Sequence, residues 1–356
     1  MKANRKWCIA FISIVLIVLI GIGCVTVIVD PYFHYHAPLD GLEYPLSSER
    51  QRYINDGILK NFNYDSIIIG SSMTENFKTS QWDEMFGTNS VKVCYSGTTF
   101  YEVRNNLQTA FEKHPDIQTV VMSADIIRLC DDKDMMRYDL TDYPMYLYDD
   151  NYFNDVSYLF NKDVLFDDLG KVLKHTLSGQ KTTTFDEYSN NSDKYVYSKE
   201  TVDAGYDRLE KTMPDKTAME DQHANVKQNV TQNIVELAKQ NPNVQFYVFF
   251  PPYSIYYWDD MNQRGLVEWQ YSNIVSATQL MVECDNIHLF AFFDKEEIIC
   301  NLNNYKDFVH YSEDINEYIL NAMHEGSGRL TSENYEQYYD NVIHSYVNYN
   351  YDALFE

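Results

Sequence analysis

The chain has 356 residues and carries 53 acidic against 28 basic side chains, which gives a formal net charge of −25 at pH 7. Such an acidic chain is repelled by the phosphates of nucleic acids, so the composition argues against DNA or RNA as a partner. The length permits a sizeable hydrophobic core, and we expect one large domain after the first thirty residues.

The first thirty residues have the pattern of a cytoplasmic tip and a transmembrane anchor. Lys2, Arg5 and Lys6 precede an uncharged apolar run from Trp7 to Val29, which exceeds the roughly 20 residues that a spanning helix needs. The run is longer than the apolar core of a cleaved signal peptide, so we expect it to be retained. Because basic residues stay on the cytoplasmic side, we expect a single-pass cell-membrane protein whose residues 31–356 form an extracytoplasmic domain.

Five short apolar runs alternate with helical patterns along the rest of the chain. Nearly continuous apolarity is typical of strands that are covered on both faces, as in a parallel sheet. Between these runs, apolar residues recur at helical spacing before His114-Pro115 and before Asn241-Pro242. The alternation predicts an open α/β sandwich. The five expected strands are Ser66–Gly70, Val91–Tyr95, Thr119–Ser123, Gln245–Phe250 and His288–Phe293.

The alternation stops between Cys130 and about Met213. This stretch is rich in Asp, Tyr, Asn and Thr, and one helical pattern, around Leu165 to Leu173, survives in it. Much of its apolar content is tyrosine and no strand pattern is sustained. We therefore expect a surface insertion over the sheet at about residues 131–215.

The cysteines and histidines give no sign of a metal site or another cofactor. Cys8 and Cys24 belong to the anchor, and the other four cysteines contain no CxxC pair and show no metal-ligand spacing. We expect those four to be mostly core residues, and a disulfide between Cys284 and Cys300 stays open. The segment around His34, directly after the anchor, is better interpreted as an interfacial aromatic belt than as a metal site.

The first expected strand ends abruptly in Gly70-Ser71-Ser72. Glycine and serine are ordinary turn formers, so the tripeptide alone fits a simple turn. It also fits a nucleophile, because open α/β sheets place their sites at the carboxyl ends of the strands. Ser72 is the candidate.

A base for such a serine is available near the end of the chain. Asp307 and His310 lie on one loop before Ser312, which has the character of a helix N-cap. A serine hydroxyl needs a base to take its proton, and a neutral imidazole needs a carboxylate to fix its tautomer. The alternative is an Asp and a His that merely cap the helix, and spacing alone leaves both interpretations open.

With these motifs the chain resembles the SGNH (GDSL-like) hydrolase superfamily, and within it the membrane-anchored proteins related to DltD, which works in D-alanylation of teichoic acids. The resemblance covers roughly Ser66 to His310 in the order of its motifs. It implies a three-layer flavodoxin-like fold with a parallel sheet and Ser72 as the nucleophile. Tyr95-Ser96-Gly97 is similar to the second block of the family, so the amides of Gly97 and Ser72 are the implied oxyanion donors.

The third block departs from the family pattern. Many members have Gly-x-Asn-Asp after the next strand, whereas this chain has Ser123-Ala124-Asp125. An ionised Asp125 would oppose a developing oxyanion, so we expect it to position substrate or to bind Arg128. The departure places the strength of esterase activity in doubt.

The resemblance implies a membrane-anchored serine esterase or O-acyltransferase that forms an acyl-serine at Ser72 without a cofactor. Its substrate would be an extracytoplasmic cell-envelope glycopolymer or an acyl ester, and a membrane-bound O-acyltransferase is the implied partner. Transfer to water gives an esterase and transfer to a polymer hydroxyl gives a transferase. The competing hypothesis is a non-catalytic scaffold of the same fold that binds polymer or a membrane acyltransferase. The altered third block favours the scaffold, and the complete set of Ser72, His310 and Asp307 opposes it.

Overall fold

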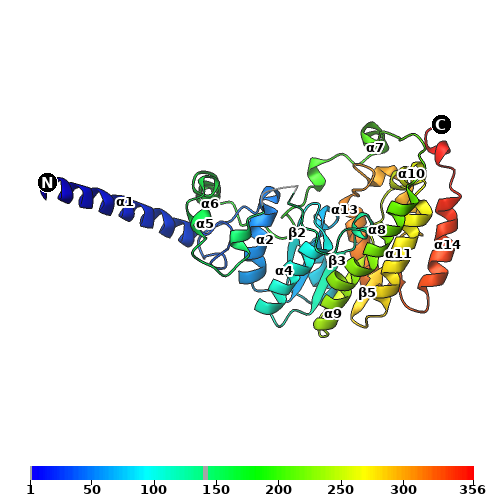
Figure 1. Ribbon diagram of the computed structural model, residues 1–356, viewed down its shortest axis with the longest axis horizontal. Coiled ribbons are helices and arrows are strands. Elements are labelled where there is room, and N and C mark those ends of the chain that lie inside the picture. Colours follow the sequence, from blue (N-terminus) through cyan, green and yellow to red (C-terminus); the bar gives the residue numbers. More distant parts are fainter. Residues whose placement is uncertain (1, 139–142) are drawn as a thin grey trace. The chain divides into compact units, whose positions relative to one another are not determined.

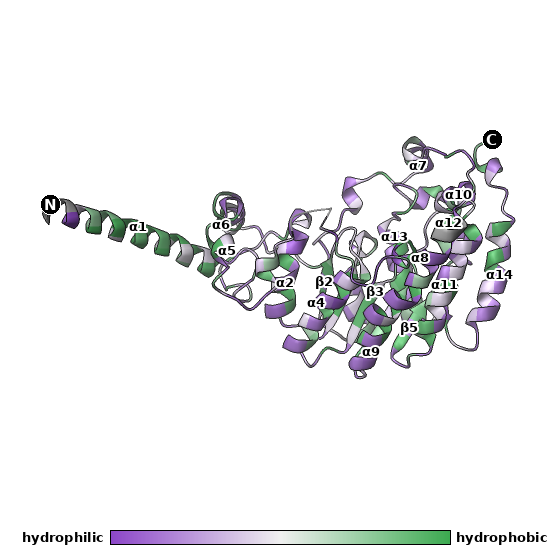
Figure 2. Ribbon diagram, viewed as in Figure 1, coloured by the Kyte–Doolittle hydropathy of each residue, from purple (hydrophilic) through white to green (hydrophobic). Residues whose placement is uncertain are grey.

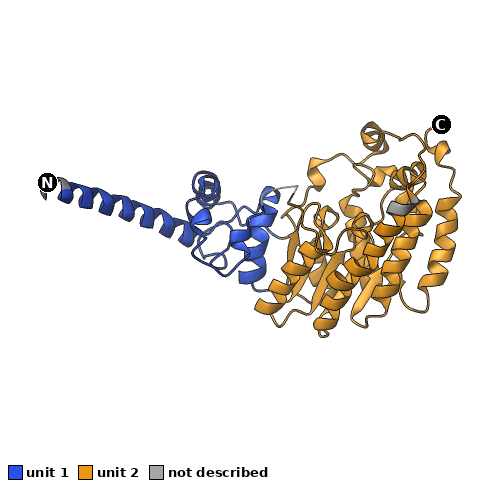
Figure 3. Cartoon of the chain, viewed as in Figure 1, with its two compact units in different colours: residues 1–63, 142–184 blue, residues 64–141, 185–356 orange. Residues whose placement is uncertain are grey.

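The computed structural model describes residues 2–138 and 143–356, and the chain forms two compact units (Figure 3). Unit 1 comprises residues 1–63 and 142–184, and unit 2 comprises residues 64–141 and 185–356. The expected insertion at 131–215 is thus divided between the units, and its residues 139–142 lie outside the described part of the chain.

Unit 1 begins with the long helix α1, Lys2–Val29. Its stretch Arg5–Val29 has a mean hydropathy of 3.1, and among the described helices it is the one long and apolar enough to cross a membrane. Figure 2 shows the helix as hydrophobic along nearly its whole length. At 1.5 Å per residue its 25 residues extend for about 37 Å, more than the roughly 30 Å hydrocarbon core of a bilayer. Length and composition suit a signal sequence as well, so the side of the membrane on which the rest of the chain lies stays a prediction.

The remainder of unit 1 folds around the segment that follows α1. Tyr32 and Phe33 are buried, so the interpretation of this segment as an aromatic belt facing lipid is wrong for these two rings. Gly57 explains the close packing, because a Cβ atom there would lie 2.1 Å from the carbonyl oxygen of Tyr32. The other helical elements of the unit are η1 Ser48–Arg50, α2 Gln51–Asn61, η4 Met145–Leu147, α5 Val156–Leu159, η5 Val164–Asp168 and α6 Leu169–Leu177.

Unit 2 is built on a six-stranded sheet in the order β2-β1-β3-β4-β5-β6. The first five strands are parallel, and the two-residue β6 is an antiparallel edge strand. The order 2-1-3-4-5 is that of flavodoxin-like sheets, which place their sites where the strand order reverses, between β1 and β3. The strands are β1 Ser66–Gly70, β2 Ser90–Cys94, β3 Thr119–Ser123, β4 Gln245–Phe249, β5 Ile287–Phe290 and β6 Arg329–Leu330.

All five apolar runs that the sequence predicted form strands, although three of them end earlier than expected, at Cys94, Phe249 and Phe290. The predicted mixed α/β architecture with a mostly parallel sheet is therefore confirmed. The strands β1, β2 and β3 are buried along their full length, as nearly continuous apolar runs require.

Helices of unit 2 pack in two groups. Helix α8 contacts both α4 and α11, and these three lie side by side in Figure 1, whereas α13 contacts α3. Helix α4 starts with a capping box in which Thr99 and Glu102 satisfy each other's backbone amides. The helices are α3 Thr79–Phe86, α4 Phe100–Lys113, α7 Lys199–Gly205, α8 Lys216–Val230, α9 Glu236–Gln240, α10 Ile255–Gln263, α11 Val267–Val282, α12 Glu296–Ile299, α13 Glu313–Glu325 and α14 Tyr335–Val347.

The six cysteines, all within the described residues, are free. Cys284 and Cys300, which the sequence left open as a disulfide, are unpaired, and Cys284 donates to the side chain of Asn286 over 3.2 Å. Cys94 and Cys284 are buried, Cys130 is half-buried and Cys300 is exposed, so the expected core location holds for two of the four.

Candidate active site

A glycine makes the turn that brings Ser72 out of the sheet. Strand β1 ends at Gly70 with φ 156°, and a Cβ atom there would lie 2.4 Å from the hydroxyl oxygen of Ser123 and 2.8 Å from the methyl group of Thr74. The next residue, Ser71, caps the short 3-10 helix η2, Ser72–Thr74, because its hydroxyl accepts the amide of Met73 at 3.2 Å. Ser72 is therefore the first residue of a helical turn at the carboxyl end of a buried strand.

Ser72, His310 and Asp307 form one chain of hydrogen bonds. The hydroxyl oxygen of Ser72 lies 2.8 Å from Nε2 of His310, and Nδ1 of His310 lies 2.7 Å from Oδ2 of Asp307. A carboxylate beside Nδ1 places the imidazole proton on that nitrogen, which leaves Nε2 to accept from the serine. The structure thus brings together the three residues predicted from the sequence.

The carboxylate of Asp307 is held in its ionised form by its neighbours. Its second oxygen, Oδ1, accepts the backbone amides of Val309 at 2.9 Å and His310 at 2.8 Å. Burial alone would raise the pKa of Asp307, but the hydrogen bonds from His310 and Val309 and the charge of His310 outweigh it and lower the pKa. Asp307 is therefore suited to stabilise an imidazolium on His310.

The loop that carries the pair is fixed to the turn that carries Ser72. The hydroxyl of Tyr311 donates to the carbonyl of Met73 at 3.3 Å, and the amide of Asn316 donates to the same carbonyl at 3.2 Å. On the other side, Ser254 donates to the carbonyl of Phe308 at 2.8 Å. The interpretation of Asp307 and His310 as simple helix caps does not account for the imidazole, which lies against Ser72 rather than the start of α13.

Gly97 lies on the loop after β2, next to the turn of Ser72. Cys94, the last residue of β2, pairs with Gly70, and the amide of Tyr95 donates to the carbonyl of Gly70 at 2.9 Å. Gly97 has φ 69°, a left-handed conformation that favours glycine. The loop therefore follows the strand beside Ser72 at the same edge of the sheet, and the role of the Gly97 and Ser72 amides as oxyanion donors stays a prediction.

Asp125 lies two residues beyond β3 and is buried, but it does not form the expected side-chain pair with Arg128. The guanidinium of Arg128 lies 3.5 Å from Asp131 instead, and Asp125 receives only the backbone amide of Arg128, on its carbonyl oxygen, at 2.8 Å. The Asp125 carboxyl accepts a hydrogen bond from Ser71 and one from Tyr253 at 3.4 Å.

Burial raises the pKa of Asp125, and the hydrogen bonds from Ser71 and Tyr253 offset only part of this effect. The environment therefore favours the neutral carboxyl group. A raised pKa lessens the charge that Asp125 would present to an oxyanion beside Ser72, which weakens the physical objection that the sequence raised against the third block.

A small pocket beside Ser72 contains polar residues that the sequence analysis missed. Glu75 accepts from the hydroxyl of Ser96 at 2.5 Å and from the side chain of Asn191 at 3.2 Å. The ammonium group of Lys306 lies 3.6 Å from the centre of the Tyr195 ring, and burial lowers its pKa. The lining residues are Ser72, Met73, Glu75, Asn76, Asn191, Lys306, His310, Tyr311 and Asn316.

The missed residues differ in the signal that the sequence gave for them. Lys306 directly precedes Asp307, so the catalytic loop could have included it. Asn191 lies in the expected surface insertion. Its backbone amide nevertheless donates to the side-chain oxygen of Asn76 at 2.9 Å, which brings that segment to the wall of the pocket. No spacing in the sequence relates Asn191 to Ser72.

Among the described residues, no group of three or more His, Cys, Asp or Glu side chains is arranged to hold a metal ion. The site can instead do nucleophilic chemistry, because a serine, a base and an orienting carboxylate are in contact. Neither a family model nor a curated protein nor a solved structure matches the chain. The function of the site therefore has to be judged from its geometry.

Proposed function

We propose that the chain is a membrane-anchored serine esterase or O-acyltransferase that acts on an extracytoplasmic cell-envelope glycopolymer. The observation that carries the proposal is the hydrogen-bonded chain from Ser72 through His310 to Asp307, with distances of 2.8 and 2.7 Å. A nucleophile, a base and an orienting carboxylate in contact are the combination that serine acyl-transfer enzymes of the triad type use.

The geometry suits a two-step reaction. The Ser72 oxygen attacks the acyl carbonyl carbon while its proton moves to Nε2 of His310, and Asp307 stabilises the imidazolium. The tetrahedral intermediate then collapses, the C–O bond to the leaving alcohol breaks, and His310 returns the proton to that alcohol. Water or a polymer hydroxyl attacks the acyl-serine in the second step, with His310 again as base, and regenerates Ser72.

Two further features support an acyl-transfer site of the SGNH type. The turns of Ser72 and Gly97 follow adjacent strands, so their amides are available candidates for an oxyanion hole. The strand order 2-1-3-4-5, with the serine after β1 and the Asp-x-x-His element before α13, supports the three-layer flavodoxin-like fold that the family resemblance implies.

The size and polarity of the pocket, together with the apolar helix α1, indicate which substrates the site could accept. The pocket beside Ser72 is small and lined mainly by polar side chains, which suits a short acyl group better than a fatty acyl chain. An apolar N-terminal helix would keep the site near the membrane, where a glycopolymer and a membrane-bound O-acyltransferase could both be reached. The acceptor, water or a polymer hydroxyl, decides between esterase and transferase.

A fluorophosphonate probe tests the proposal directly, because it reacts with serines that are activated as nucleophiles. The full-length protein in detergent should be labelled, and Ser72→Ala should abolish the label. Ser71→Ala is the matched control and should keep it, because the Ser71 hydroxyl contacts Met73 and Asp125 rather than His310. A folded wild-type protein that takes up no probe would contradict the proposal and favour the non-catalytic scaffold.

A further inference from the structure

Unit 1 exposes large apolar side chains on the segment 153–177, which contains the short helices α5 and α6. Phe166 is 82 % exposed and Leu177 is 87 % exposed, and Leu173 lies between them at helical spacing. The opposite side of the same helical stretch, with Val164, Leu169 and Val172, is buried. The exposed side therefore carries an apolar stripe of Phe166, Leu173 and Leu177, which the exposed charged side chains of Asp163, Asp167, Lys171 and Lys174 flank. Large exposed apolar side chains that share one face of a helix mark a contact surface.

The same segment contacts α1 inside its apolar stretch. The hydroxyl of Thr26 donates to the carbonyl of Leu159 at 3.2 Å, and the ring of Phe160 lies 3.9 Å from the position of a Cβ atom on Gly23. An apolar groove between α1 and α5 is lined on the α1 side from Leu16 to Ile28, and α6 also contacts α1.

These contacts place the segment at the depth of a membrane boundary. A hydrocarbon core of about 30 Å takes up about 20 residues of helix. Counted from Lys6, at the charged end of the apolar run, the far boundary of the core falls near Thr26. Leu159 and Phe160, which touch Thr26 and Gly23, then lie at the level where acyl chains meet headgroups.

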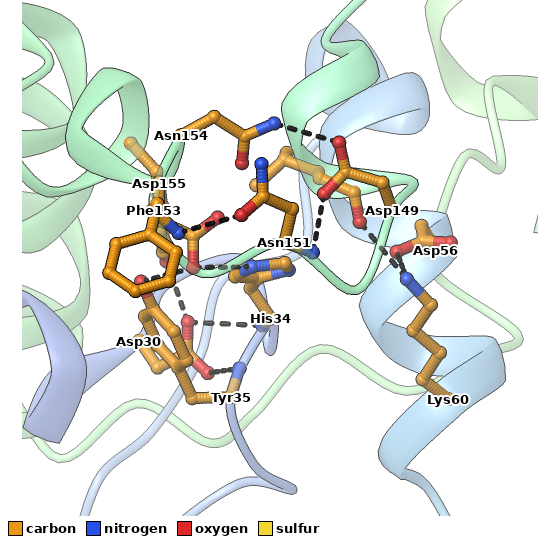
Figure 4. Close-up of polar contacts among 12 residues, drawn as sticks. Asp30, His34, Tyr35, Asp56, Lys60, Asp149, Asn151, Phe153, Asn154 and Asp155 are labelled. Carbon is orange, nitrogen blue, oxygen red and sulfur yellow. Dashed lines mark hydrogen bonds and ion pairs between the residues drawn. The ribbon is translucent and has the colours of Figure 1, made fainter.

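A buried polar network fixes the segment to the end of α1 (Figure 4). The Asp30 carboxylate accepts from the hydroxyl of Tyr158 at 2.7 Å and from the backbone amide of Tyr35 at 2.7 Å. Asp155 in turn accepts from the hydroxyl of Tyr35 at 3.0 Å, and Nε2 of His34 lies 3.2 Å from it. Because Asp155 is the N-cap residue of α5 and Tyr158 lies within it, the position of α1 in a bilayer also sets the position of α5.

We propose that residues 153–177 lie in the membrane interface at the C-terminal end of α1 and form a second, monotopic contact with phospholipid. Phe166, Leu173 and Leu177 enter the acyl region, and the exposed Lys162 and Lys174 extend to the headgroups. Lipid is the occupant that fits, because the apolar surface continues directly from a helix with the composition of a membrane span. This inference rests on the proposed anchoring role of α1 and is independent of the chemistry at Ser72.

Lipid photolabelling of the full-length protein tests the inference. The protein is reconstituted in phosphatidylcholine nanodiscs that contain a phospholipid with a diazirine on its acyl chain, and adducts are mapped by mass spectrometry. We expect adducts on α1 and on peptides that cover residues 153–177. Adducts on α1 alone would overturn the second contact while retaining the anchor. Their absence from α1 as well would overturn both, whatever the result of fluorophosphonate labelling.

A double variant gives the matched comparison. Phe166→Ser with Leu177→Ser should lower the adducts on residues 153–177 several-fold and leave those on α1 unchanged, because both side chains are exposed and their loss removes no core packing. Val196→Ser with Met213→Ser, at positions of unit 2 that are 69 % and 92 % exposed, should change neither. Equal labelling of the first double variant and the wild type would contradict the assignment of these side chains to the acyl region.

Discussion

The imidazole Nε2 of His310 lies 2.8 Å from the hydroxyl oxygen of Ser72, although 238 positions of sequence separate the two residues. Two buried hydrogen bonds support this contact, because Tyr311 and Asn316 both donate to the carbonyl of Met73, next to Ser72. The loop of the base and the turn of the nucleophile are therefore connected through one carbonyl group. Hydrogen bonds of this kind hold a nucleophile in position before the substrate binds.

We expect Ser72, His310 and Asp307 to act as one unit in turnover of an activated acetyl ester. Ser72→Ala and His310→Ala should each lower kcat by several powers of ten, roughly as in other serine enzymes, and Asp307→Ala by somewhat less. The Ser72→Ala, His310→Ala double variant should be little worse than either single variant, because the base is useful only beside the nucleophile. If His310→Ala kept near-normal turnover while Ser72→Ala lost it, another base would have to serve Ser72.

Asp125→Asn should make the protein more stable at neutral pH than the wild type. Burial raises the pKa of Asp125 in the folded state above its unfolded value. A carboxyl group with a raised folded pKa contributes its full stability below the unfolded pKa and loses it as pH rises through the folded value. Asparagine keeps an acceptor for Ser71 and Tyr253 and does not titrate, so its advantage should appear above about pH 4 and vanish below it.

Urea unfolding of both proteins at several pH values measures this difference. The Asp125→Asn variant should also preserve most esterase activity, since a neutral amide replaces a carboxyl group whose environment favours the neutral form. If the variant had a lower free energy of unfolding than the wild type at pH 7 and the same free energy at pH 3, Asp125 would be ionised in the folded protein and its neighbours would stabilise the charge.

The sheet was accessible from the sequence because its strands have a strong local signal, whereas the triad had weaker local marks that the family resemblance supplemented. Parallel strands buried on both faces are nearly continuous apolar runs, and Ile67, Ile68 and Ile69 of β1 are completely buried. Ser72 and His310 are marked by their positions after a strand and before a helix. Strand β6 lacked such a signal because it has only two residues, Arg329 and Leu330.

The fate of the tyrosine-rich segment could not be predicted in the same way. Hydropathy scales place tyrosine between apolar and polar residues, yet Tyr158 and Tyr188 are completely buried. Tyr158 can be buried because its hydroxyl donates to Asp30. That partner lies 128 positions away in sequence, so no local pattern reveals it. For the same reason the location of Asn191 at the wall of the pocket could not be predicted from the sequence.

Gly70→Ala should destabilise the protein by about 2–5 kcal/mol, because the new methyl group meets a steric clash and a strained backbone together. The Cβ atom would lie 2.4 Å from the hydroxyl oxygen of Ser123 at a φ of 156°. Gly87→Ala is the matched control. Its φ of 68° strains an alanine, but nothing lies within 4 Å of the new Cβ atom, so we expect a cost of about 1–2 kcal/mol.

Equilibrium unfolding in urea gives both values. Gly70→Ala should also lower esterase turnover, because Thr74 and Ser123, which bracket the turn of Ser72, have to move. Equal destabilisation by the two substitutions would show that backbone strain alone, and not the contact with Ser123, makes glycine necessary at position 70.

Tyr158→Phe should loosen the start of α5 without removing core volume. The Tyr158 hydroxyl donates to Asp30 at 2.7 Å and accepts the backbone amide of Tyr32 at 3.2 Å, so its loss leaves a buried amide without that acceptor. The expected cost is about 1–3 kcal/mol, and hydrogen exchange should accelerate at residues 30–36 and 155–160. Tyr152→Phe is the control. Tyr152 is 71 % exposed, so the loss of its hydroxyl should lower the free energy of unfolding by less than about 0.5 kcal/mol. Unchanged exchange in Tyr158→Phe would mean that the remaining contacts of Asp30 and Asp155 suffice to hold α5 on the end of α1.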